Sequence, residues 1–70
     1  MTATKTHELH FETAARNQGQ IVTYSHARTT RGKTITSRHD ASDGSLHFSW
    51  DSGRRLNTVE LARYGLVEVN

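Results

Sequence analysis

The chain of 70 residues has no cysteine and no proline, and only 7% of its residues are aromatic. The absence of cysteine excludes disulfides and thiolate metal sites. No apolar stretch approaches the ~20 residues that a membrane-spanning helix needs, and the N-terminal residues lack the apolar core of a secretory signal. We therefore expect a cytoplasmic protein that makes no contact with a membrane.

The hydrophobic core that this sequence can build is small. The length fits one domain, residues 1–70, in which we expect residues 1–5 to be frayed. A single core in a domain of this size supplies about 3–5 kcal/mol of stability, and association is one way to bury more apolar surface. We expect a homo-oligomer, such as a homodimer, in which the third strand or the face bearing Trp50 meets another copy.

One short helix is predicted near the C-terminus, over residues 58–64, because its start and stop signals are complete. Asn57 is a good N-cap, and Glu60 is spaced to complete a capping box with it. Leu56 and Leu61 have the spacing of a hydrophobic staple across the same end. Gly65 supplies the left-handed residue that ends a helix.

The rest of the chain is typical of short antiparallel strands separated by turns. Strands are predicted over residues 6–12, 21–27, 34–39, 46–50 and 66–69, although residues 12–16 also suit a helical turn. Only Ile35 is large and apolar in the third strand, which favours a sheet edge or a strand covered by a partner. The predicted fold is α+β and mostly β. It is a meander of four to five strands with the helix before the last one, and it resembles the plan of SH3-like small barrels.

Residues 27–34 match the loose pattern of a phosphate-binding loop in which Ala27 replaces the first glycine. Such a loop needs a buried strand before it and a helix after it. A strand-like segment follows here, and the chain is too short for the α/β domain that surrounds these loops. We therefore expect a hairpin turn at this position.

Five histidines raise the question of a metal site. His7 and His10 are three residues apart, whereas zinc ligands on one helical face are four apart. His26, His39 and His47 fall on different predicted strands, where a solvent-facing side chain is the default. A chain of this size also has little room for a deep pocket. We predict no metal, no cofactor and no enzymatic activity.

Charge is the feature that stands out, because carboxylates are absent from the 27 residues 13–39. This stretch has a net charge of +5, whereas residues 1–12 have −1 and residues 40–70 have −2. The positive charge of the chain, +2 overall, is therefore concentrated in residues 13–39. Most of its cations lie on or between the second and third predicted strands. A basic two-stranded ribbon of this kind can enter a DNA groove or follow a phosphate backbone.

The sequence therefore predicts a small protein that binds DNA or RNA with little dependence on base sequence. The expected phosphate contacts are Arg28, Arg31, Lys33 and Arg38, with Arg54 and Arg55 as a second contact and with Tyr24 and Trp50 stacking on bases. The alternative is a protein-binding module, an inhibitor or regulator of the kind frequent among phage and plasmid accessory factors. It would use an exposed edge strand or its basic face to bind a protein partner.

Overall fold

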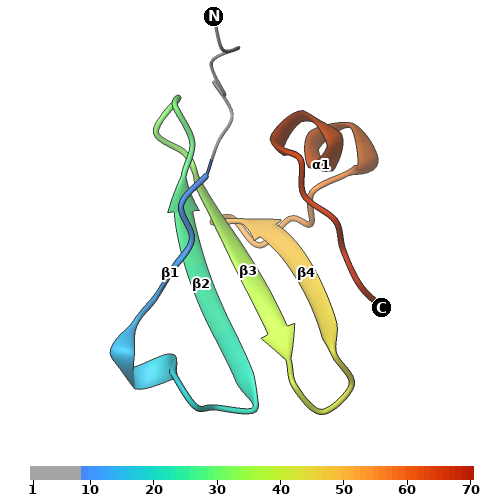
Figure 1. Cartoon of the computed structure of the whole chain (residues 1–70). Coiled ribbons are helices and arrows are strands. Elements are labelled where there is room, and N and C mark those ends of the chain that lie inside the picture. Colours follow the sequence, from blue (N-terminus) through green and yellow to red (C-terminus); the bar gives the residue numbers. More distant parts are fainter. Residues whose placement is uncertain (1–8) are drawn as a thin grey trace, which may run out of the picture.

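The computed structural model describes residues 9–70, whose strands follow one another in a meander (Figure 1). The strands are β1 (Glu12–Thr13), β2 (Val22–Arg28), β3 (Thr34–Asp40) and β4 (Ser45–Trp50). A 3-10 helix, η1 (Ala15–Asn17), follows β1, and α1 (Thr58–Tyr64) follows β4. All neighbouring strands are antiparallel, in the order β1-β2-β3-β4. The predicted mostly-β α+β class is confirmed.

The three longer strands begin within one residue of their predicted positions, but the N-terminal strand is different. Of the predicted strand over residues 6–12, residues 6–8 lie outside the described part of the chain. Pairing with β2 is limited to two positions, Glu12 with His26 and Thr13 with Ser25. The chain then turns into η1, so the helical-turn interpretation of this segment was partly right.

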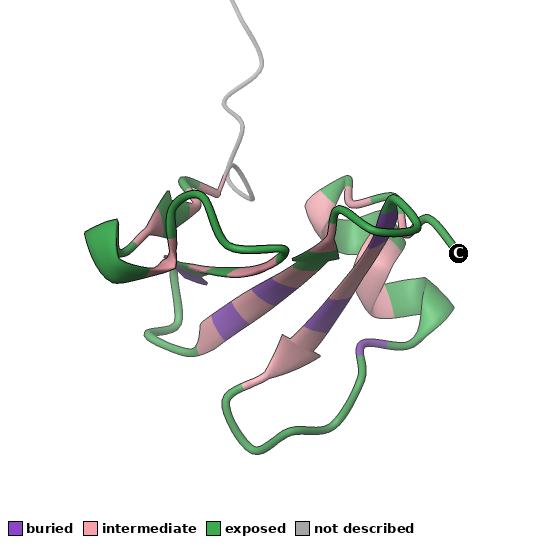
Figure 2. Ribbon diagram, turned by 90° about the horizontal axis from the view of Figure 1, so that it is seen from below, coloured by how far each residue is buried: buried purple, intermediate pink, exposed green. Residues whose placement is uncertain are grey.

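The side chains of the sheet divide between two faces because successive residues of a strand point to opposite sides. We call the face that carries Ala27, Ile35 and Phe48 the inner face. Ile35 has no solvent exposure, and Phe48 and Leu56 are 5% exposed. Leu61 and Tyr64 of α1 pack against this cluster, so the helix covers the inner face. Figure 2 shows buried residues along β3 and β4 and at the entrance to the helix.

The third strand is central, and the prediction that β3 forms a sheet edge was wrong. β2 pairs with it over seven positions and β4 over six, so both of its edges are occupied within the chain. A polar strand is tolerated here because Ser37, buried on the inner face, donates to the Ser25 carbonyl over 3.5 Å. His39, at the end of the strand, is also on the inner side but is exposed, and Thr34, Thr36, Arg38 and Asp40 alternate onto the opposite face, which we call the outer face.

The segment after α1 covers the edge of β4 but does not close the sheet. The predicted last strand is reduced to one bridge, in which Leu46 and Val69 exchange backbone hydrogen bonds of 2.8 and 2.9 Å. The Phe48 N–H donates to a carboxylate oxygen of Glu68 over 2.9 Å. Within residues 9–70 the sheet is open, with β1 and β4 at its two edges, and no pairing between them makes a barrel.

The helix forms as its local signals predict. The Asn57 side chain accepts from the Glu60 N–H, and the Glu60 carboxylate accepts from the Asn57 N–H, at 2.8 and 2.9 Å. Gly65 has φ +69°, and the Leu66 N–H donates to the Leu61 carbonyl over 2.9 Å, which completes a Schellman turn. With seven residues, α1 is far too short to cross a bilayer, and no other helix of the described chain could do so.

Candidate nucleic-acid interface

The turn between β2 and β3 is held in one conformation by its own hydrogen bonds. The buried Thr29 hydroxyl accepts from the Arg31 and Lys33 N–H groups over 3.3 and 3.1 Å. The Thr29 N–H donates to the Lys33 carbonyl over 2.7 Å, and Gly32 adopts φ +82°. This segment is the hairpin turn that the sequence predicts, and it does not lead into a helix as a phosphate-binding loop does.

Three cations are grouped at this turn, at Arg28, Arg31 and Lys33. The Arg28 guanidinium donates to the Gly32 carbonyl over 3.2 Å, a contact that orients the group and leaves its charge unneutralised. Lys33 lies with its Nζ 5.4 Å from the centre of the Trp50 ring. None of the ion pairs formed within residues 9–70 includes these three cations. The turn therefore carries three cations that have no carboxylate partner among the described residues.

Arg38 lies further along the same hairpin, on the outer face, and is only loosely paired. Its Nη2 is 3.7 Å from Oδ2 of Asp40. The other carboxylate oxygen of Asp40 accepts from the Ser42 hydroxyl and N–H over 2.5 and 2.9 Å, and these bonds lower the pKa of Asp40. With its side chain 43% exposed, Arg38 remains accessible to an anion.

Arg54 and Arg55, the second predicted contact pair, both form ion pairs with carboxylates of the C-terminal segment. Two nitrogens of Arg54 donate to the two carboxylate oxygens of Glu60 over 3.3 and 2.8 Å. Arg55 donates to Glu68 over 3.0 Å. Together with the Asn57 N–H, the Arg54 contact lowers the pKa of Glu60 to about 2. Both arginines therefore anchor the C-terminal segment, and we do not include them in the interface.

The two aromatic side chains that were expected to stack on bases lie on opposite faces of the sheet. Trp50 is in register with Ile35 on the inner face, and its ring meets Tyr64 edge to face with 6.2 Å between centroids. Tyr24 is on the outer face and 41% exposed. The sequence contained a signal for this separation, because Leu46, Phe48 and Trp50 alternate as one apolar face. One nucleic-acid strand lying on the outer face would meet Tyr24 only.

Sequence reasoning missed the polar row beside Tyr24 on the outer face. The backbone register aligns Glu12, His26, Thr36 and Ser49 across the four strands. His26 Nδ1 is 3.0 Å from the Thr36 hydroxyl oxygen. The alternation of each strand was readable from the sequence, but the alignment between strands was not, because it depends on register.

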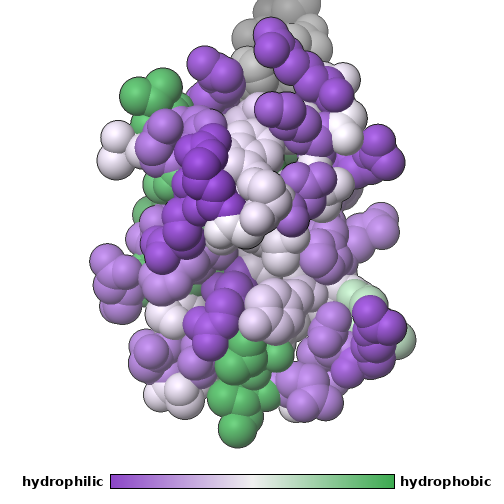
Figure 3. All heavy atoms as spheres, turned by 180° about the vertical axis from the view of Figure 1, so that it is seen from behind, coloured by the Kyte–Doolittle hydropathy of each residue, from purple (hydrophilic) through white to green (hydrophobic). Residues whose placement is uncertain are grey.

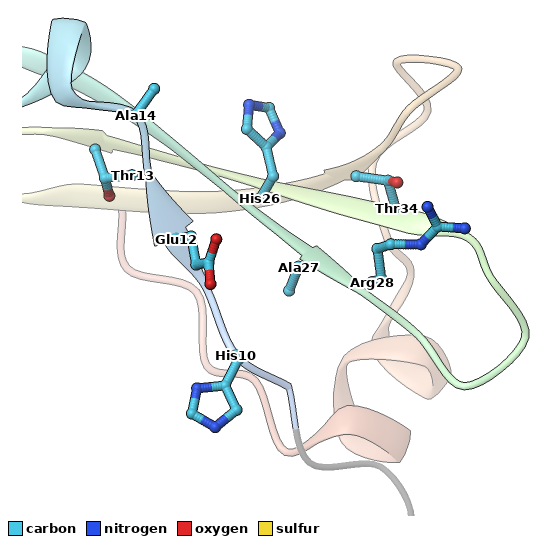
Figure 4. A pocket seen from close by; sticks show the side chains of 8 residues that line it. All are labelled: His10, Glu12, Thr13, Ala14, His26, Ala27, Arg28 and Thr34. Atoms are coloured by element: carbon cyan, nitrogen blue, oxygen red, sulfur yellow. The ribbon is translucent and has the colours of Figure 1, made fainter.

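An open groove of about 600 Å³ lies next to this row, where β1 stops pairing with β2 (Figure 4). Its walls include His10, Glu12 and His26. In Figure 4 the Arg28 side chain extends from the groove toward the hairpin turn, in agreement with its bond to Gly32. The described residues contain no group of three His, Cys, Asp or Glu side chains arranged to hold a metal ion. Glu12 and Arg28 both line the groove, so its charge is mixed.

The described part of the chain is thus a small open antiparallel sheet that a helix covers on one face, with a polar outer face and a basic hairpin turn. Comparison of the chain with models of protein families, with curated proteins and with solved structures found no match.

Proposed function

We propose that this protein binds nucleic acid through the phosphate backbone, using the β2–β3 hairpin. The supporting observation is the ordered turn that carries Arg28, Arg31 and Lys33 without a carboxylate partner among the described residues. Arg38 extends this charge along the hairpin. Guanidinium and ammonium groups are the usual ligands of phosphate oxygens, and such contacts do not depend on base sequence.

Preorganisation of the turn supports the proposal. Because hydrogen bonds of Thr29 and Gly32 already fix the backbone of the loop, little backbone entropy is lost when the cations bind an anion. The protein-binding alternative cannot use β3 as an exposed edge strand, because β3 is central, so it would depend on another edge strand or on the basic face.

The test is a salt series, because binding to phosphates releases counterions. Four phosphate contacts on duplex DNA predict a slope of log K against log salt of about −3 to −4, since each contributes roughly −0.9. Arg31→Ala should weaken binding to all sequences by a similar factor and make the slope shallower by about one unit.

Arg63→Ala is the matched control, because it removes one exposed arginine from the last turn of α1 and none from the hairpin. It should leave both affinity and slope close to those of the wild type. A wild-type slope near zero would rule out phosphate binding and favour the protein-binding module. Equal losses in Arg31→Ala and Arg63→Ala would show that the net charge, and not the hairpin, attracts the nucleic acid.

A further inference from the structure

Three planar side chains occupy one row across the outer face of the sheet. Tyr24 on β2 is the register partner of Arg38 on β3, and Arg38 is the partner of His47 on β4. Adjacent strands are ~4.8 Å apart, so the three positions span about 10 Å. Tyr24 and Arg38 are accessible, and His47 is half-buried.

Aromatic rings, imidazoles and guanidinium planes are the groups on which unpaired bases stack in proteins. Bases in a duplex stack on one another and present only their edges and the backbone. A row of stacking groups therefore favours a strand whose bases are exposed. Stacking on such a row adds little to duplex binding, which depends on contacts between cations and phosphates.

The surroundings of the row suit the same ligand. His47 Nε2 is 3.0 Å from the side-chain oxygen of Asn70, a contact that holds the imidazole in place. The Thr36 and Ser49 hydroxyls, in the next row, can exchange hydrogen bonds with base edges. Seen from behind, the surface is mostly hydrophilic, with hydrophobic atoms at its lower end and along its left side (Figure 3). Ile21, which precedes β2, is 65% exposed.

We infer that the ligand is single-stranded nucleic acid, whose bases stack on the row of Tyr24, Arg38 and His47 while its phosphates contact the basic turn. The inference rests on the proposed function and specifies it further. α1 and the core cluster occupy the inner face, so the row is on the side of the sheet that the helix leaves uncovered.

The experiment measures fluorescence anisotropy of a dye-labelled 12-nucleotide DNA of mixed sequence, single-stranded or annealed to its complement, at one low salt concentration. We expect the wild type to bind the single strand at least about tenfold more tightly than the duplex. Tyr24→Ala should weaken single-strand binding by about 5- to 150-fold, the equivalent of the roughly 1–3 kcal/mol measured for stacked bases, and should leave duplex binding unchanged. Tyr24→Phe keeps the ring and should retain most of the affinity.

His39→Ala is the matched control for His47→Ala. The two histidines lie on the neighbouring strands β3 and β4, but His39 is on the inner side, in register with Thr23 and Leu46. We expect His47→Ala to weaken single-strand binding and His39→Ala to leave it unchanged. Circular dichroism of each variant will confirm that the sheet is intact.

The outcomes separate this inference from the function on which it rests. Equal binding of single strand and duplex, with Tyr24→Ala no weaker than the wild type, would overturn the stacking row and leave phosphate binding by the hairpin in place. Equal affinity losses in Tyr24→Phe and Tyr24→Ala would also overturn it, because the aromatic ring would not be the group that binds. No binding of either DNA at low salt would overturn both proposals.

Discussion

Replacement of Gly65 by alanine tests how the C-terminal segment is attached to the sheet. Gly65 has φ +69° and ψ 30°, and its N–H donates to the Ala62 carbonyl over 3.2 Å. A Cβ at this position would meet no heavy atom within 4 Å, so the substitution introduces no clash. The cost is therefore conformational. The left-handed region costs an L-residue roughly 1–2 kcal/mol, which the reduced entropy of the unfolded chain partly offsets.

We expect Gly65→Ala to lower the free energy of unfolding by about 1 kcal/mol. In a domain of this size such a loss lowers the melting temperature by roughly 4–8 °C, which circular dichroism detects readily. Gly65→Asn is the control, because asparagine tolerates the left-handed conformation and should cost less. An alanine variant with the melting temperature of the wild type would refute the reasoning. An asparagine variant that melts at a lower temperature than the alanine variant would also refute it.

Two further predictions concern the cap of α1 and the core. The pKa of Glu60 is lowered from 4.5 to about 2, first by Arg54 and then by the Asn57 N–H, so the carboxylate stabilises the fold fully above pH ~4.5 and loses this effect as the pH falls toward 2. The wild type should lose more stability than Glu60→Gln across that range in urea titrations, and parallel losses would contradict this assignment. Ile35→Val removes one methylene from a fully buried side chain and should cost about 0.5–1.5 kcal/mol, whereas an unchanged urea midpoint would show that this site is not closely packed.

The sequence alone determined the elements whose signals are local. The capping box, the staple and the left-handed glycine of α1 act between residues at most five apart, so the helix limits were predictable. The hairpin turn around Gly32 was predictable for the same reason. Strand positions followed from alternation and turn residues, which also depend on neighbours in the chain.

Only the tertiary structure decided how these elements combine. β3 was predicted as an edge strand because most of its side chains are polar. The sequence did not show that Ser37, a small residue, would lie beside a β2 carbonyl. Arg55 appeared free, but its partner Glu68 lies 13 residues away and is brought near by the path of the chain after α1. The row that starts at Tyr24 exists only through the registers of two strand pairs. Register and long-range charge pairing depend on how the whole chain packs, and no short stretch of sequence encodes them.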